Sequence, residues 1–224
     1  MLPRELEVRR IEKQLVRELN NILNNIKDEN TKDISVLQSK YDMQVQHALR
    51  AAIQKTYIIA GENVLSKKNR NNRGPVTEQL FSAAFVSPLN MHFLTQQDLG
   101  NIVTKAKEYV GVFWRRTASF LRASDILPST VGFNGPAAIN PNALVTSLGV
   151  DAVTDSYGDA VTDKMDQIGG GGRIKFVTAH DERVCPECSS IDGLEWDLSD
   201  PSIEEPPIHD NCRCRLEPVG QGYE

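Results

Sequence analysis

The sequence predicts an α+β protein, with a mostly α-helical N-terminal region and a small β-rich C-terminal module. Three observations predict it. Apolar stripes at helical spacing fill most of residues 1–168, and all four cysteines lie within the last 40 residues. The charge also changes sign, because residues 1–150 carry 19 basic and 13 acidic side chains, whereas residues 151–224 carry 6 and 17. We therefore expect two regions, at 1–168 and 173–219.

Helical periodicity defines the N-terminal region. Apolar residues recur every three or four positions over 3–28, 33–67, 95–123 and 142–167, which predicts four long helices. A shorter helix is expected at 77–86. The first two long helices are interpreted as an antiparallel hairpin, and a coiled-coil contact with a partner subunit is the alternative use of their stripes.

The segments between these helices are rich in polar residues, glycine and proline. Residues 66–75 are basic and end in Gly-Pro, which favours an exposed loop over a phosphate contact. Residues 124–142 contain three prolines and two glycines and indicate a linker. Trp114 lies beside Arg115 and Arg116, a pair that could stack on and bind nucleic acid. A buried aromatic side chain with arginines extending to solvent is the favoured interpretation.

Four aspartates recur along the last long helix, at Asp151, Asp155, Asp159 and Asp163. Such spacing could bind a divalent cation, but it more often marks a solvated acidic face, and that is the expectation here. The glycines at 169–172 then break the helix and predict a hinge before a strand at 173–179. They are no phosphate loop, because no Gly-Lys-Ser/Thr follows.

The cysteines form a pattern typical of a metal site. Cys185 and Cys188 are a Cys-x-x-Cys pair, and His209, Cys212 and Cys214 follow after a gap of 20 residues. Zinc prefers four nitrogen or sulfur ligands in a tetrahedron. The four cysteines would supply these four ligands. His209 with three cysteines, in place of Cys212 or Cys214, would supply them as well. The intervening segment has an Asp-Gly turn and a strand-like run, so a structural zinc ion would hold together a module of little core.

Other uses of the cysteines are less favoured than a structural zinc site. A redox Cys-x-x-Cys is disfavoured because no thioredoxin-like βαβ pattern surrounds it. The chain has a charged start and lacks a long apolar run, which favours a protein made and kept in the cytoplasm. Disulfides are disfavoured there because the cytoplasm is reducing. His180 and Asp181 could belong to a zinc-dependent nucleic-acid-processing enzyme, but no helix fits after Cys214. A zinc-finger DNA-binding protein is a further alternative, and the acidic module argues against both because it repels phosphates.

The C-terminal segment also resembles the phage Mu F-like minor head proteins, or phage head morphogenesis proteins. The resemblance covers about 45 residues closely. It is carried by Thr178, Asp181, Arg183, Cys185, Cys188, Asp192-Gly193, Pro206-Pro207, His209, Asn211 and Cys212-Arg213-Cys214. Phe176 departs from the tryptophan often found in the family. Asp181 and Arg183 could pair with the arginine of Cys-Arg-Cys or with groups that support the metal ligands, and a plain surface role is the alternative.

The resemblance implies a virion protein made in the host cytoplasm that acts without catalysis at the portal vertex during capsid assembly. Its implied partners are portal proteins and capsid or scaffold proteins. A role in DNA packaging or ejection would make packaged DNA a further partner. No membrane partner is implied.

Overall fold

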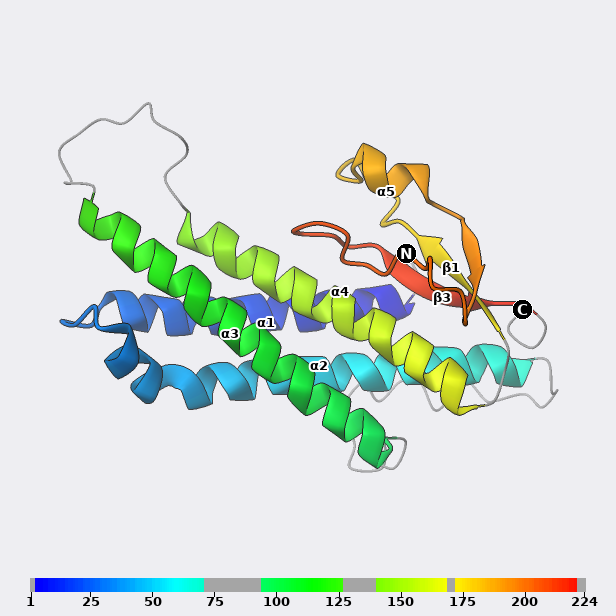
Figure 1. Cartoon of the computed structure of the whole chain (residues 1–224), viewed down its shortest axis with the longest axis horizontal. Coiled ribbons are helices and arrows are strands. Elements are labelled where there is room, and N and C mark those ends of the chain that lie inside the picture. The colour runs from blue at the N-terminus through cyan, green and yellow to red at the C-terminus, as the bar shows by residue number, and fades with distance from the viewer. Residues whose placement is uncertain (1–2, 71–93, 127–139, 169–171, 221–224) are drawn as a thin grey trace.

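The computed structural model describes residues 3–70, 94–126, 140–168 and 172–220, and it confirms the predicted α+β class. Four long helices form a bundle, and a small antiparallel sheet lies at one end of it (Figure 1). The helices are α1 Pro3–Lys27, α2 Ile34–Arg70, α3 Gln96–Ile126 and α4 Pro141–Gln167. Among these described helices, none is long and apolar enough to cross a membrane.

Side-chain caps fix where three of the helices begin. Asp33 accepts hydrogen bonds from the backbone N–H (2.9 Å) and hydroxyl (2.6 Å) of Ser35, as expected from its position before α2. Thr95 and Asp98 exchange hydrogen bonds at the start of α3, each accepting from the backbone N–H of the other. Asn140 caps α4, and Pro141 follows it in the first turn.

Helix α4 packs against each of the other three long helices, as α2 also does. The approach to α1 is close: a Cβ added at Gly149 would lie 2.6 Å from Cγ2 of Val16. Between residues 147 and 165 nearly every side chain of α4 is buried or half-buried. A helix covered on several sides needs apolar or paired groups all round, so α4 is not amphipathic in the usual one-sided sense.

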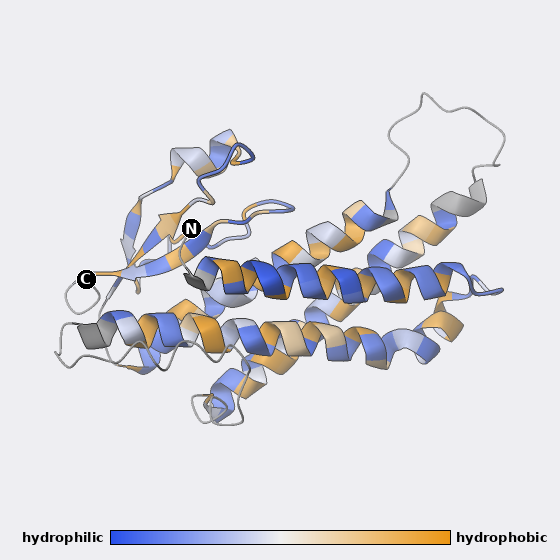
Figure 2. Ribbon diagram, turned by 180° about the vertical axis from the view of Figure 1, so that it is seen from behind, coloured by the Kyte–Doolittle hydropathy of each residue, from blue (hydrophilic) through white to orange (hydrophobic). Residues whose placement is uncertain are grey.

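Helices α1, α2 and α3 bury the stripes that the sequence predicts. On α1 the five predicted inward residues are all buried, namely Ile11, Leu15, Leu19, Ile22 and Ile26. Figure 2 shows α1 and α2 in front, with hydrophilic residues over much of the face toward the viewer. Trp114 is 5% exposed, packs edge-on against Phe113 and donates from Nε1 to Asp42 (2.8 Å), which confirms the buried-aromatic interpretation.

Several predicted connections differ from the structure or lie outside it. Helix α2 continues to Arg70, so the first residues of the basic segment 66–75 are helical. Lys67 in that segment forms an ion pair with Glu217 (3.0 Å). The predicted helix at 77–86, most of the linker 124–142 and glycines 169–171 lie outside the described residues.

The C-terminal sheet has three strands in the order β2-β1-β3, both pairs antiparallel. The strands are β1 Arg173–Val177, β2 Glu195–Asp197 and β3 Arg215–Val219. In the register, Ile174 faces Trp196 on β2, and Phe176 faces Leu216 on β3. A one-and-a-half-turn helix, α5 Pro186–Ser190, lies between β1 and β2 in the chain. The sequence predicted β1 and the strand-like run of β2, but neither α5 nor β3.

The sheet and the bundle share one hydrophobic core. Ile174, Phe176 and Leu216 are fully buried in the same cluster as Tyr57 of α2 and Val161 of α4. Cys188, Cys212 and Cys214 belong to this cluster too. The C-terminal segment therefore gains much of its burial from the helices, and the predicted hinge at 169–172 does not separate two cores.

Polar contacts reinforce the same junction. Arg215 at the start of β3 forms ion pairs with Glu5 of α1 (2.8 Å) and Glu217 (2.8 Å). Lys164 near the end of α4 forms a buried ion pair with Asp98 of α3. Burial is the largest single effect and acts to raise the pKa of Asp98, but the hydrogen bonds from Lys164, Thr95 and Gln167 together outweigh it, so the pKa lies below its usual value.

Candidate metal centre

A helix N-terminus positions the first two candidate ligands. Cys185 is the N-cap of α5, and its Sγ accepts a hydrogen bond from the backbone N–H of Cys188 (3.2 Å). Pro186 occupies the first helical turn, where its missing N–H removes no hydrogen bond. This short turn brings the two sulfur atoms of the Cys-x-x-Cys pair onto one side.

A tight loop before β3 positions the other three. The backbone N–H of Cys212 donates to the carbonyl of His209 (3.1 Å), and Asn211 lies between them in the left-handed region, with φ of 62°. Asparagine adopts that region more easily than other residues with a side chain. Cys214 directly precedes β3, so the pairing of β3 with β1 fixes its place.

The five predicted ligands come together in two groups that share Cys188. Nε2 of His209 lies 3.1 Å from Sγ of both Cys185 and Cys188. Sγ of Cys188 lies 3.8 Å from Sγ of Cys212. The first group is Cys185, Cys188 and His209, the second is Cys188, Cys212 and Cys214, and within each group all ligand atoms lie within 4.8 Å of one another. Such a cluster could hold a metal ion.

The imidazole is oriented for binding through Nε2. Nδ1 of His209 lies 2.9 Å from the backbone carbonyl of Asp210, and a protonated Nδ1 donates to it. That contact leaves Nε2 free to face the two cysteines, the usual arrangement of a metal-binding histidine. The same carbonyl raises the pKa of His209, because it stabilises the protonated ring.

The thiols differ in how readily they ionise. A hydrogen bond from the Cys214 thiol lowers the pKa of Cys212 to about 5, while burial raises that of Cys188 to about 12. The Cys188 backbone N–H lowers the pKa of Cys185. Donating its proton to Cys212 raises the pKa of Cys214. Four buried or half-buried sulfurs with one ionised thiol are a favourable starting point for a cation, which replaces the shared protons.

The chain around the cluster is braced by a bidentate ion pair. The guanidinium of Arg213 donates to both carboxylate oxygens of Asp181, at 2.6 and 2.9 Å. This pair confirms the expected contact between Asp181 and the arginine of Cys-Arg-Cys, and it lowers the pKa of Asp181. Arg183 is 67% exposed in its side chain and lies 3.9 Å from the same carboxylate, so its contact is the weaker one.

The acidic stripe of α4 does not form a solvated face. Asp155 and Asp159 are half-buried against α3, where both form ion pairs with Lys105, at 2.9 and 2.7 Å. Asp163 accepts from the side-chain amide of Asn101 (2.8 Å). Asp151 is 6% exposed. The expectation failed because neighbouring elements cover α4 on several sides, so its polar positions face them.

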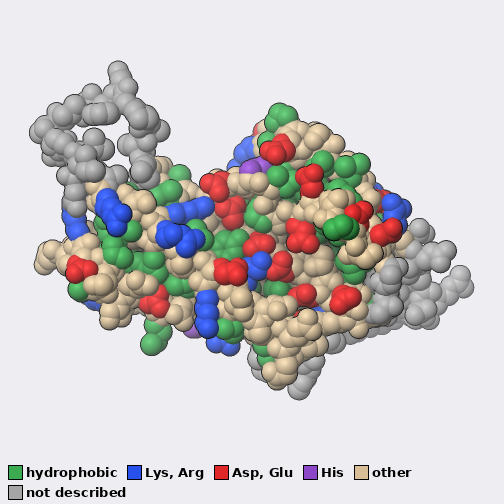
Figure 3. Space-filling model, viewed as in Figure 1, with side chains coloured by type: hydrophobic (Ala, Val, Ile, Leu, Met, Phe, Trp, Pro, Cys, Tyr) green, Lys and Arg blue, Asp and Glu red, His purple; other side chains and the backbone are tan. Residues whose placement is uncertain are grey.

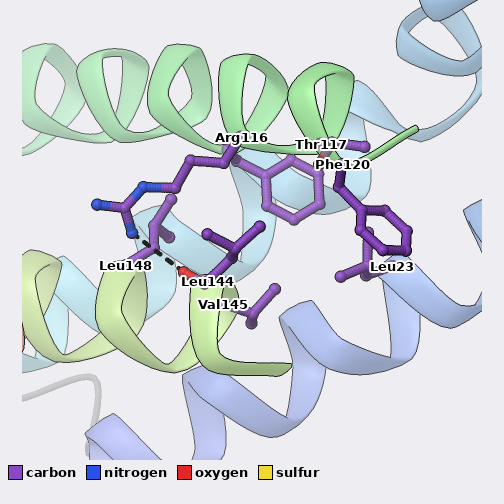
Figure 4. Close-up of a pocket in the computed structure, with 8 residues that line it drawn as sticks. Leu23, Arg116, Thr117, Phe120, Leu144, Val145 and Leu148 are labelled. Carbon is purple, nitrogen blue, oxygen red and sulfur yellow. Dashed lines mark hydrogen bonds between the residues drawn. The ribbon is translucent and has the colours of Figure 1, made fainter. Parts of the chain in front are cut away.

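Two concave regions flank α4, and neither is a site of the predicted kind. A polar groove between α3 and α4 is lined by Lys105, its ion-pair partner Asp159, and Asp163. At the far end, Figure 4 shows an apolar pocket that Phe120, Leu144 and Leu23 line, closed at one side where Arg116 donates to the Leu144 carbonyl (3.0 Å). Its volume of about 10 Å³ holds at most one water molecule.

One pair of residues around the cluster escaped prediction. The hydroxyl of Thr154 donates to the carbonyl of Cys212 (2.8 Å), and the carboxylate of Asp151 accepts from the backbone N–H of Asn211 (2.8 Å). Both come from α4, about 60 residues before the loop. No local sequence pattern reports a contact at that separation.

Comparison with known proteins identifies the C-terminal part of the chain. No curated protein and no solved structure matches it. A family model does match, over residues 153–217, which include the second half of α4, strands β1 and β2, the first residues of β3 and all five candidate ligands. Over residues 153–217 the chain is therefore similar to the family described as Phage Mu protein F like protein, the family that the C-terminal motif resembles.

Proposed function

We propose that this protein is a phage head morphogenesis protein whose C-terminal segment is held together by a structural zinc ion. One observation carries the proposal: the segment that matches the Phage Mu protein F like family contains the whole cluster of five ligands. The family supplies the biological setting, and the cluster supplies the chemistry.

Zinc fits the donor set of the cluster. Thiolates and imidazoles are the ligands that structural zinc sites use. In a tetrahedral site with zinc–sulfur bonds of about 2.3 Å, two sulfur atoms lie about 3.8 Å apart. The separation of Cys188 and Cys212 in the structure is 3.8 Å. Cys185, Cys188 and Cys212 with His209 or Cys214 would complete the shell, and a bound zinc ion would cross-link α5 to the loop before β3.

A structural role is favoured over a catalytic one. Five candidate donors are enough to close a four-coordinate shell, and three of the sulfurs are buried. Asp181, the nearest candidate for a catalytic carboxylate, is engaged on both oxygens by Arg213. His180 is exposed, and within the described residues its ring lies near the polar side chains of Thr178 and Asp192. We therefore propose no catalytic step for this chain.

The two ends of the molecule suit different partners in an assembling head. Figure 3 shows Lys and Arg side chains gathered toward the end of the bundle away from the sheet, and Asp and Glu side chains over the middle and the sheet end. Arg115 and Arg122 are among the exposed basic residues of α3. Complementary charge guides protein association, so the basic end suits packaged DNA or acidic portal surfaces. The acidic end suits basic patches on portal, capsid or scaffold proteins.

The head role is tested on phage particles from a lysogen that encodes this chain. We expect quantitative mass spectrometry to find the chain in purified virions at few copies per particle, after synthesis in the host cytoplasm. A nonsense mutation early in its gene should reduce the yield of DNA-filled heads. Absence of the chain from virions, together with normal infectious yield from the nonsense mutant, contradicts the proposal.

A further inference from the structure

Two hydrogen bonds join helix α4 to the loop that carries His209, Cys212 and Cys214, three of the five candidate ligands. Thr154 and Asp151 are one helical turn apart, so their side chains project from the same face of α4. The Thr154 hydroxyl donates to the Cys212 carbonyl, and the Asp151 carboxylate accepts from the Asn211 N–H, both at 2.8 Å. Thr154 is 8% and Asp151 6% exposed, so water does not compete freely for either contact.

The two contacts hold adjacent residues in the tightest part of the loop. Asn211 has a positive φ of 62°, which an ordinary extended or helical segment does not need. Its N–H points to Asp151 and not into the loop, so the loop itself cannot satisfy that group. The Cys212 carbonyl likewise bonds to α4. Helix α4 therefore holds the backbone of Asn211 and Cys212 through contacts that come from outside the loop.

Placement of this loop decides whether the ligands can share one ion. Cys185 and Cys188 belong to α5, whereas His209 and Cys212 belong to the loop, and 20 residues separate Cys188 from His209. Ligand atoms must meet a metal within a few tenths of an ångström, and partners that orient ligands tune affinity strongly. Among the described residues, the loop forms no hydrogen bond to α5 apart from those of the ligand atoms. Its position relative to α5 is therefore set by its contacts with α4, together with the Arg213–Asp181 ion pair and the pairing of β3 with β1.

We propose that Thr154 and Asp151 are positioning residues of the metal site, so that a helix of the bundle forms part of it. This inference rests on the proposed zinc role. Metal binding and the packing of α4 against the loop then stabilise each other, because a coupling between two equilibria acts in both directions. The metal site thus links the helical bundle to the C-terminal segment, and its ligands are not positioned by that segment alone.

The test measures zinc affinity of the full chain by competition with a chromophoric chelator. Thr154→Val removes the hydroxyl and keeps the shape of the side chain, and we expect its affinity to fall by about tenfold or more. Thr154→Ser keeps the hydroxyl and should bind zinc nearly as tightly as the unmodified chain. The matched control is Thr56→Val, since Thr56 is fully buried but donates to Ala52 within its own helix. Its affinity should not change.

Asp151 gives a second and independent pair of variants. Asp151→Asn retains an oxygen that accepts from the Asn211 N–H, so it should lose less affinity than Asp151→Ala. The absorption bands of the cobalt-substituted protein report the ligand set directly. We expect them to shift in Thr154→Val and Asp151→Ala and to stay unchanged in Thr56→Val.

The outcomes separate the two proposals. If the unmodified chain binds zinc and folded Thr154→Val and Asp151→Ala bind it within about twofold of that affinity, the positioning role is wrong and the zinc role stands. An equal loss in Thr56→Val also overturns the positioning role, because the effect is then one of general stability. If the unmodified chain binds no zinc, the zinc role itself fails, and the inference with it.

Discussion

The guanidinium of Arg213 and the carboxylate of Asp181 form a two-point ion pair, with N–O distances of 2.6 and 2.9 Å. Arg213 lies between Cys212 and Cys214, and Asp181 follows β1, so the pair ties the ligand loop to the chain that leads into α5. Both side chains are largely buried, at 13% and 21% exposure. The ion pair therefore braces the chain on both sides of the cluster, the loop at Arg213 and the segment before α5 at Asp181.

Replacing Arg213 by lysine should weaken this brace. Lysine cannot donate from two planar nitrogens, so one of the two hydrogen bonds is lost. We expect Arg213→Lys to lower the free energy of unfolding by about 1–2 kcal/mol in urea titrations. Arg183→Lys is the matched control, because Arg183 is exposed and only 3.9 Å from the same carboxylate. Equal effects of the two substitutions would show that the two-point geometry does not matter.

The close approach of α1 and α4 at Gly149 predicts an overpacking effect. A Cβ there would lie 2.6 Å from Cγ2 of Val16, so Gly149→Ala should cost about 1–3 kcal/mol in unfolding experiments. Val16→Ala removes the clashing methyl groups, so adding it to Gly149→Ala should recover part of the loss. Gly100→Ala is the control, with nothing within 4 Å of its Cβ, and it should leave stability equal or higher. A neutral Gly149→Ala would mean that the helices are further apart.

The stability lost on replacing Lys164 should depend on whether the buried Asp98 keeps its charge. Lys164→Met leaves the buried Asp98 carboxylate without its cation, and we expect a loss of about 3–5 kcal/mol. Adding Asp98→Asn removes the unpaired charge while it keeps an oxygen that can accept from the Thr95 N–H. The double variant should therefore be more stable than Lys164→Met alone. If the two losses simply add in denaturant titrations, the groups are not coupled in the folded protein.

Asp159 should make stability depend on pH. Burial raises its pKa from 3.8 to about 6 in the folded protein, so between about pH 4 and 6 the folded state binds more protons than the unfolded state. The contribution of Asp159 to stability is then greatest below pH 4 and is lost as the pH rises through 6.

The measurement compares Asp159→Asn with the unmodified chain at several pH values. Asparagine does not titrate, so the stability of the variant relative to the unmodified chain should rise between pH 4 and 7, by up to about 3 kcal/mol. A difference that stays constant over this range contradicts a raised pKa. A difference that falls with pH indicates that the ion pair with Lys105 dominates and lowers the pKa instead.

The parts of the fold that the sequence predicted are those that local patterns encode. The stripe of α1 and the cap at Asp33 depend on neighbours within a few residues, and both are observed. The ligand cluster was predictable because the Cys-x-x-Cys pair and the spacing of His209 and Cys212 each indicate a local turn, and both turns are observed. Their meeting across 20 residues depends on β1 and β3 pairing, which the spacing could only suggest.

What the sequence missed depends on long-range packing. Asp155 and Asp159 look like a solvated stripe because a periodic pattern cannot show that α3 covers this side of α4. Strand β3 contains Pro218, which argues against a central strand, but β3 is an edge strand of the described sheet and tolerates it. Thr154 is an ordinary helical threonine until the fold brings the Cys212 carbonyl to it.

The metal content of the full chain tests the account most directly. The chain should be purified without chelators and without histidine tags, and its metals measured by mass spectrometry alongside thermal unfolding with and without a chelator. We predict about one zinc ion per chain and a lower unfolding temperature once zinc is removed, because binding free energy contributes to folding. Less than about half an equivalent of any metal, with no thermal shift on chelation or on zinc addition, would contradict the account.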